Sequence, residues 1–203
     1  RDEDGFDAHC HHLIVEDLES HEIVGTYRLQ SRAMARAGSG FYSAAEFALD
    51  ELGNEILDEA IELGRACIDE KHRNTRVLFL LWRGLATYMQ ASGNRYFFGC
   101  CSLTSQSPAE GVAMFAKLRA GDAVDAAHLV SVQPRYACVP AGAVPTESPD
   151  IPKLMGLYLT YGARIVSGPA LDREFGTIDF LALFDLESLR PAHRKLFLEP
   201  RQA

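Results

Sequence analysis

The residues best suited to chemistry lie in one short apolar segment. Glu62 and Arg65 interrupt residues 60–68, a run whose aliphatic and β-branched residues predict a strand. Strict alternation would place the two side chains on opposite faces of a sheet. Gly64 favours a β-bulge, which would bring both to one face and leave a backbone N–H able to stabilise an oxyanion. We therefore predict Glu62 and Arg65 to be catalytic; a structural ion pair is the alternative.

A cationic loop follows this strand directly. It contains four residues that can carry positive charge, namely Lys71, His72, Arg73 and Arg76. The clearest helical pattern of the chain, over residues 77–91, begins just after it. Because a helix start offers free N–H groups and the positive end of a dipole, we predict a phosphate-binding loop. The alternative is a solvated basic turn, since no Gly-x-Gly pattern is present to cradle a pyrophosphate.

These segments belong to an alternating series of expected strands and helices. Strands are expected over residues 11–16, 23–29, 60–68, 96–103, 130–136, 163–167 and 180–185, and helices over 44–52, 77–91, 108–120 and 151–161. Residues 30–43 are expected to form a loop, and residues 186–197 an amphipathic helix or an extended arm. The alternation favours an α/β fold with a central mixed sheet flanked by helices. The length of 203 residues fits one domain over residues 1–203.

Composition and spacing exclude several classes of protein. The net charge of −8 argues against a nucleic-acid partner. The five cysteines form no Cys-x-x-Cys pair, which favours a reducing, cytoplasmic location. Residues 77–91 include Arg83 and are too few to cross a bilayer. The run from His9 to His12 offers zinc-binding side chains, yet strand neighbours point to opposite faces and no second ligand pair exists, so no metal is expected.

A series of short motifs in fixed order carries a more specific signal. The motifs are DGFD at 4–7, VGTYRL at 24–29, FYS at 41–43, EF at 46–47, ELGR at 62–65, LWRGLA at 81–86 and FGCCS at 98–102. Together they resemble the ornithine N-acyltransferases that begin ornithine-lipid synthesis, over most of the chain. The resemblance implies a GNAT-like fold, the fold of acyl-CoA N-acyltransferases. The spacing also resembles the related acyl-homoserine-lactone synthases, which carry phenylalanine where this chain has Ala66.

The resemblance adds residues to the expected site. In the lactone synthases, acidic and basic residues that match Asp4, Asp7, Arg28, Glu62 and Arg65 form an ionic cluster around the site. We accordingly expect Asp4 and Asp7 to bind a substrate ammonium, and Arg28 or Arg65 to pair with its carboxylate. Glu62 would accept the proton of the attacking amine. The alternatives are a frayed acidic terminus for Asp4 and Asp7 and an exposed side chain for Arg28.

The activity implied is transfer of a 3-hydroxyacyl group to the α-amino group of ornithine or a similar amino acid, giving a lyso-lipid. GNAT enzymes usually hold the pyrophosphate of coenzyme A in a Gly-rich loop. The absence of this pattern favours the phosphopantetheine arm of acyl carrier protein as donor, with no cofactor bound. Because carrier proteins are acidic, Lys71, Arg73, Arg76 and Arg119 are the expected docking residues.

Several alternatives stay open on the sequence alone. The apolar surfaces of residues 77–91 and 96–103 line an acyl tunnel or simply form the core. Homoserine-lactone synthesis, acylation from coenzyme A, and a non-catalytic binding module on the same fold are the competing functions. The basic residues that precede Leu196 and Phe197 suggest peripheral contact with the inner membrane, and a docked terminal arm is the alternative.

Overall fold

The computed structural model describes residues 3–142 and 148–198 and is built on a seven-stranded mixed sheet. The strands are β1 (His11–Glu16), β2 (Ile23–Ser31), β3 (Ala60–Ile68), β4 (Tyr96–Leu103), β5 (Arg164–Ile165), β6 (Ala170–Asp172) and β7 (Thr177–Asp185). The α-helices are α1 (Arg32–Ala37), α2 (Asn54–Asp58), α3 (Thr75–Ser92), α4 (Pro108–Ala120), α5 (Lys153–Tyr161) and α6 (Pro191–Leu198). None of the described helices is both long and apolar enough to cross a membrane.

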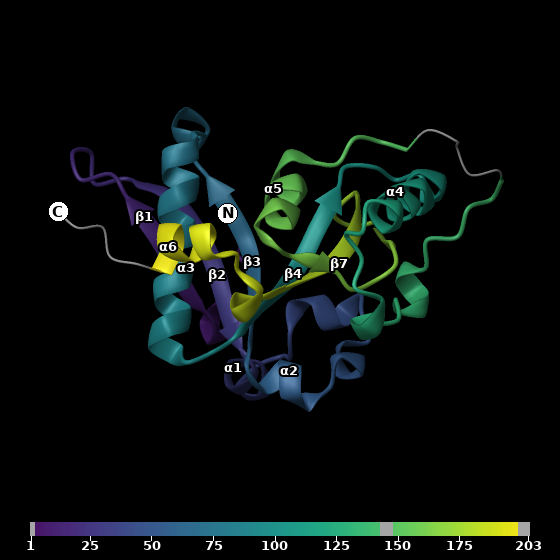
Figure 1. Cartoon of the computed structure of the whole chain (residues 1–203), viewed down its shortest axis with the longest axis horizontal. Helices are drawn as coiled ribbons and strands as arrows, with labels where there is room; N and C mark the ends of the chain where they lie inside the picture. Colours follow the sequence, from purple (N-terminus) through teal and green to yellow (C-terminus); the bar gives the residue numbers. More distant parts are fainter. Residues whose placement is uncertain (1–2, 143–147, 199–203) are drawn as a thin grey trace.

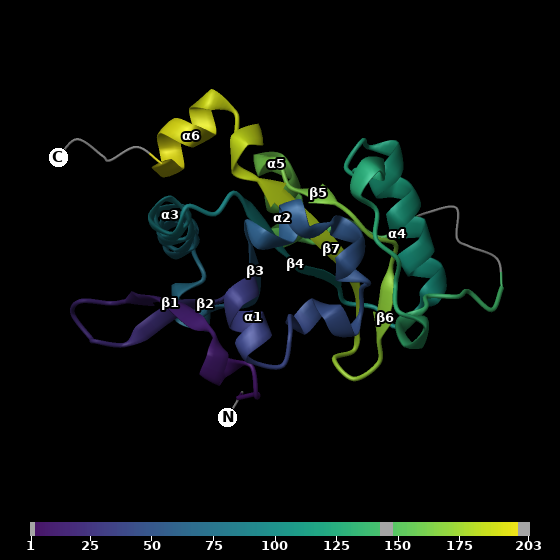
Figure 2. The same ribbon diagram turned by 90° about the horizontal axis from the view of Figure 1, so that it is seen from below.

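The strand order is β1-β2-β3-β4-β7-β5, with β6 paired to the far end of β7. β3 and β4 are parallel and joined by α3, whereas the other named strand pairs are antiparallel. Helices α3, α4, α5 and α6 lie on one face, and the N-terminal segment and α1 lie on the other (Figures 1 and 2). This arrangement confirms the expected α/β fold with a mixed sheet flanked by helices.

Helix α3 shows how the sequence positions these elements. Its buried stripe includes Leu81, Leu85 and Met89, four residues apart, which pack against β2 and β3. Asn74 caps the start, where its side chain accepts hydrogen bonds from the backbone of Arg76 and Val77. The helix ends at Gly93, which adopts the left-handed conformation that favours glycine.

Some sequence-based expectations about elements were wrong. Residues 30–43 are not a loop, because β2 extends to Ser31 and α1 follows at once, its first turn capped by the Ser31 hydroxyl. Residues 130–136 are not a strand. They make two isolated bridges and then enter a 3-10 turn at Pro134, which has no N–H to donate to a sheet. The two short strands β5 and β6 replace the single expected strand over 163–167.

Candidate active site

The parallel strands β3 and β4 separate soon after they meet. They pair at only three positions, ending at Glu62 with Phe98, and then diverge (Figure 1). Gly99 lies where the separation begins, and a side chain there would collide with the carbonyl oxygen of Leu63. Glycine therefore allows the two backbones to touch at this point before they part.

A cavity of about 440 Å³ occupies the gap and reaches residues from both faces of the sheet. Its polar lining includes Arg28, Gln30, Tyr42, Glu62, Arg65 and Asp179. Its apolar lining includes Trp82, Leu85, Met155, Tyr158, Tyr161, Phe184 and Phe197. The site thus joins a charged region on one face to an aromatic region on the other.

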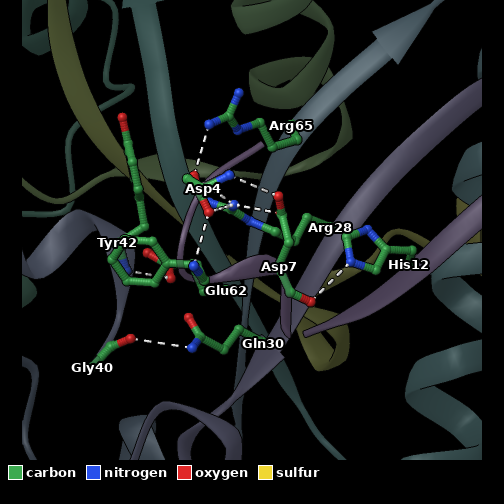
Figure 3. A network of polar contacts seen from close by, with 10 residues as sticks. Asp4, Asp7, His12, Arg28, Gln30, Gly40, Tyr42, Glu62 and Arg65 are labelled. Atoms are coloured by element: carbon green, nitrogen blue, oxygen red, sulfur yellow. Dashed lines mark hydrogen bonds and ion pairs between the residues drawn. The ribbon is translucent and has the colours of Figure 1, made fainter. Parts of the chain in front are cut away.

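At the polar end, four charged side chains form what we call the ionic cluster: Asp4, Asp7, Arg28 and Arg65 (Figure 3). One Arg28 Nη1 donates to both Asp4 oxygens at 2.8 Å and to Asp7 at 3.0 Å. Arg65 donates to Asp4 at 2.7 Å. Burial alone would raise the pKa of Asp4, but hydrogen bonds from the two arginines and from the backbone of Phe6 lower it to about 2. The cluster therefore contains two negative and two positive charges.

The structure brings these four predicted residues together, and it qualifies their predicted roles. Arg28 is buried, with only 4% of its surface exposed, and is not the exposed arginine of the alternative reading. Asp4 and Asp7 are likewise ordered by their ion pairs and are not a frayed terminus. In the absence of substrate the carboxylates and guanidinium groups bind each other, so their binding of substrate stays a prediction.

Glu62 lies on the same sheet face and binds a neighbouring turn. Its carboxylate accepts hydrogen bonds from the backbone of Tyr42 and Ser43, both at 2.8 Å, and from the Ser43 hydroxyl at 2.5 Å. Burial raises the pKa of Glu62, and these hydrogen bonds oppose part of the rise. Since a carboxylate offers about four acceptor positions, roughly one is left for a water or an amine. The predicted role as base stays untested.

The β-bulge occurs, but one residue later than predicted. Gly64 pairs regularly with Arg28, and the register shifts where Tyr27 faces Arg65 and Ala66. Arg65 carries the positive φ of 50° that glycine usually adopts in such bulges. The Arg28 guanidinium lies over Gly64, and two of its nitrogens would be 3.8 Å from a Cβ added at this position. A Cβ would therefore still fit beside Arg28, and a larger side chain would meet the guanidinium; the bulge turns Arg65 toward Asp4.

The β3–α3 loop differs in detail from the predicted phosphate loop. Lys71, Arg73 and Arg76 are exposed, while His72 pairs with Asp69 at 2.9 Å. The side chain of Asn74 already accepts from two of the N–H groups at the helix start. Anion binding at this loop would therefore depend more on its cations than on free backbone donors.

A second hollow adjoins this loop. It is lined by Tyr27, Ala66, Cys67, Ile68, Arg73, Leu78, Leu81 and Leu154, and it shares Tyr27, Ala66 and Leu154 with the main cavity. One of the loop cations, Arg73, thus lies beside a recess that continues toward the gap between β3 and β4.

The aromatic end of the cavity is formed by elements far apart in sequence. Trp82 of α3 contacts Tyr158 and Tyr161 of α5 and Phe197 of α6, with ring centroids 4.8–6.0 Å apart. Phe197, which the sequence placed in a tail that contacts a membrane or docks, is buried against α3. The tail is therefore docked through Phe197, and contact of its exposed residues with a membrane stays a prediction.

A second group of acidic residues was missed by sequence reasoning. We call Glu46, Asp172 and Asp179 the acidic cluster; each offers an oxygen, and these oxygens lie within 4.8 Å of one another. Among the described residues, it is the group of at least three His, Cys, Asp or Glu side chains whose ligand atoms lie close enough together to bind one metal ion. The side chains of His9–His12 are not part of such a group. The cluster lies close to Cys100, whose pKa is raised by burial and by the charges of Glu46 and Asp179.

Comparison with known proteins identifies the family. The chain is 33% identical over 201 residues to the L-ornithine N(alpha)-acyltransferase of Brucella abortus, covering 93% of this chain and 72% of that protein. The chain belongs to this family. The enzyme of the same name from Rhizobium meliloti is also 33% identical, over 92% of this chain and 67% of its own length. The resemblance found in the motifs is thus confirmed.

Two further comparisons concern the fold of this acyltransferase. The model of the acetyltransferase (GNAT) domain family matches residues 1–83, which contain the ionic cluster and Glu62. The solved structure of the coenzyme A-dependent acyl-homoserine lactone synthase BjaI, with SAM and isopentyl-CoA, is similar with a TM-score of 0.51. It covers 97% of this chain and 67% of that chain at 10% identity, so this likeness concerns the fold.

Proposed function

We propose that this acyltransferase moves a 3-hydroxyacyl group from acyl carrier protein to the α-amino group of ornithine. The observation that carries the proposal is the cavity through the gap between β3 and β4, charged at one end and aromatic at the other. Such a cavity can align an amino acid with a long acyl thioester, and the relatives are named for N(alpha)-acylation of ornithine. Residues 1–203 would act as one domain.

The donor would approach from the β3–α3 loop. Lys71, Arg73 and Arg76 would pair with the acidic carrier protein and the phosphate of its phosphopantetheine arm, and His72 would add charge when protonated. The arm would follow the second hollow into the gap, which carries the thioester toward Glu62. The acyl chain would then extend among the aromatic rings around Trp82. Coenzyme A is the competing donor.

The acceptor would bind at the ionic cluster. Asp4 and Asp7 would attract one of its ammonium groups, and Arg28 or Arg65 would pair with its carboxylate. Glu62 would take the proton from the α-ammonium, directly or through a water, so that the neutral amine attacks the thioester carbon. The amide C–N bond would form as the C–S bond breaks, and the proton that the attacking nitrogen loses would pass to the leaving thiolate of the phosphopantetheine arm, directly or through a water. The raised pKa of Glu62 suits this role, because a base works best when its pKa lies near the operating pH.

The decisive assay supplies the purified protein with 3-hydroxyacyl carrier protein or the matching acyl-coenzyme A and a panel of amino acids. We expect an N-acylornithine by mass spectrometry, formed faster from the carrier protein. Glu62→Gln should lower kcat by about 100-fold or more, because general-base catalysis contributes about that much. Glu55→Gln, an exposed change on α2, is the matched control. No amide from either donor would refute the proposal, and equal turnover by Glu62→Gln would remove Glu62 from the base role.

The product would be amphiphilic, which bears on where the enzyme works. We place it in the cytoplasm, with peripheral contact at the inner membrane through α6, whose Arg194 and Lys195 are exposed beside the partly exposed Leu196. Sedimentation with anionic vesicles should retain the protein at low salt and release it at high salt. Equal recovery with neutral vesicles would argue against this contact.

A further inference from the structure

The acidic cluster is short of positive charge. Glu46, Asp172 and Asp179 are each less than 10% exposed, and no described lysine, arginine or histidine forms an ion pair with any of them. Glu46 Oε2 and Asp179 Oδ1 are buried without a hydrogen-bond partner. Buried carboxylate oxygens without partners are costly, and either a proton shared between Glu46 and Asp179 or a bound cation can remove this cost.

Two other oxygens of the cluster accept hydrogen bonds from residues close by in the sequence. Asp172 Oδ1 accepts from the backbone of Glu174 at 2.8 Å and of Phe175 at 2.9 Å, which fixes the turn between β6 and β7. Asp179 Oδ2 accepts from the Thr177 hydroxyl at 3.2 Å. The cluster is thus held by its own segment, and the two unpartnered oxygens belong to Glu46 and Asp179.

The cluster opens toward the candidate active site. Asp179 lines the main cavity together with Glu62 and Tyr42. On β4, Asp179 pairs with Ser102 and Glu62 with Phe98, an even spacing that puts both carboxylates on one sheet face. Glu62 also lies close enough for its charge to contribute to the raised pKa of Glu46. A ligand that reaches Glu62 can therefore extend toward Asp179.

The geometry favours an ammonium group over a metal ion. A hard divalent cation needs about six oxygen ligands, several of them usually waters. An ammonium needs only three acceptors, and the cluster offers two unpartnered oxygens with Asp172 beside them. An ammonium on a short aliphatic chain can also enter through the cavity that would hold the acceptor.

We propose that Glu46 and Asp179, supported by Asp172, bind the side-chain ammonium of the acceptor and select a diamino acid over a neutral one. This inference rests on the proposed function, since it names the subsite for the second charge of the same substrate. The ionic cluster would hold the α-carbon end, and the acidic cluster the far end.

The test compares ornithine with norvaline, which has the same carbon chain without the terminal ammonium. For the wild-type protein we expect kcat/KM to be about 100-fold higher with ornithine, because leaving a buried charge unpaired costs about this much. Asp179→Asn should lower kcat/KM for ornithine by about 100-fold and leave norvaline within about threefold. Glu46→Gln should act in the same direction. Asp50→Asn, an exposed change of the same charge nearby, should alter neither.

Calorimetric binding without any acyl donor provides the second readout. Ornithine should bind the wild-type protein more tightly than norvaline does, and this difference should vanish in Asp179→Asn. If no amide forms with any amino acid, the proposed function fails. The binding comparison still tests whether Glu46 and Asp179 bind the side-chain ammonium. If Asp179→Asn does not fold, Glu46→Gln and the wild-type comparison decide it.

Three results would overturn the subsite. The first is equal use and equal binding of ornithine and norvaline by the wild-type protein, which would leave the acyltransferase proposal intact. The second is an equal loss for both amino acids in the variants, which would indicate a structural role. The third is a melting temperature that falls with EDTA and recovers with Mg²⁺, Ca²⁺ or Mn²⁺ in the wild type but not in Asp179→Asn, which would indicate a metal site.

Discussion

The ionic cluster and the acidic cluster lie on the same face of the sheet and are built in opposite ways. In the ionic cluster, two carboxylates meet two guanidinium groups at 2.7–3.0 Å. In the acidic cluster, three carboxylates meet without a cation, and two of their oxygens have no partner. The difference teaches that buried carboxylates can be balanced in two ways: arginines neutralise those of the ionic cluster, whereas a retained proton or a bound cation must neutralise those of the acidic cluster.

The pKa values follow the same contrast. Burial would raise the pKa of Asp4, but arginine hydrogen bonds lower it to about 2. Burial raises the pKa of Glu46 to about 8, and the charges of Asp179 and Asp172 add to the rise. The ionic cluster is therefore charged across the neutral range, whereas the acidic cluster retains a proton until a cation replaces it.

Removing the central cation of the ionic cluster should give the largest effect on stability. Arg28→Ala leaves Asp4 and Asp7 without their main partner, and breaking a buried ion pair from one side costs about 3–5 kcal/mol. Urea unfolding at neutral pH measures the loss. Arg173→Ala, an exposed arginine in the β6–β7 turn, should change the free energy of unfolding by less than about 0.5 kcal/mol. Equal values for the two variants would mean that the ionic cluster does not stabilise the fold.

Neutralising one carboxylate of the acidic cluster should raise the free energy of unfolding, whereas Arg28→Ala lowers it. The pKa of Glu46 is raised from 4.5 to about 8 in the folded protein. Its contribution to stability is therefore complete below pH 4.5 and is lost as the pH rises toward 8. Glu46→Gln lacks this loss, so without ligand it should exceed the wild type by about 2–3 kcal/mol at pH 8 and by less at pH 5.

Urea unfolding across this pH range measures whether Glu46→Gln is more stable than the wild type. Asp4→Asn removes a carboxylate of the ionic cluster and serves as the comparison. Since the pKa of Asp4 is lowered from 3.8 to about 2, its contribution is present above pH 3.8 and is lost as the pH falls toward 2. The two variants should therefore depart from the wild type with opposite signs: at pH 8 Asp4→Asn is less stable than the wild type and Glu46→Gln is more stable, and both differences shrink as the pH falls toward 2. A difference between Glu46→Gln and the wild type that does not vary with pH would contradict the contrast.

The smallest effect concerns the bulge that brings Arg65 into the ionic cluster. Arg65→Gly loses an ion pair that is partly exposed, but it relieves a positive φ that costs a non-glycine residue about 1 kcal/mol. Arg65→Ala loses the same ion pair and keeps the strain. We expect the glycine variant to be the more stable of the two by about 1 kcal/mol in urea unfolding. Equal stability would show that the backbone here is not strained.

The sequence predicted the ionic cluster and missed the acidic one for a physical reason. Asp4, Arg28 and Arg65 belong to motifs with a fixed order, and the resemblance of these motifs to the lactone synthases implied that the three side chains form a cluster. Glu46 and Asp179 are separated by most of the chain, and the motif at 46–47 assigned no role to Glu46. Their meeting depends on the way residues 130–132 bridge distant segments, such as Phe47 to Val132, and no local pattern records this.

The position of the bulge also depends on a contact that the sequence pattern does not reveal. Gly64 was the natural choice for the irregular residue, because glycine adopts a positive φ at little cost. The structure instead keeps Gly64 regular under the Arg28 side chain and places the positive φ at Arg65. A bulky side chain at position 64 would compete for space with the Arg28 guanidinium. The sequence does not show that Arg28 lies over this residue.

The position of Cys100 beside the acidic cluster has a consequence for the donor. A thiol attacks a thioester only as the thiolate, and an acyl thioester held in the cavity would lie near this sulfur. Burial and the surrounding carboxylates hold its pKa well above 9, so the sulfur stays protonated. Burial, with the charges of the carboxylates added to it, would thereby keep this thiol from competing with the amine for the acyl group.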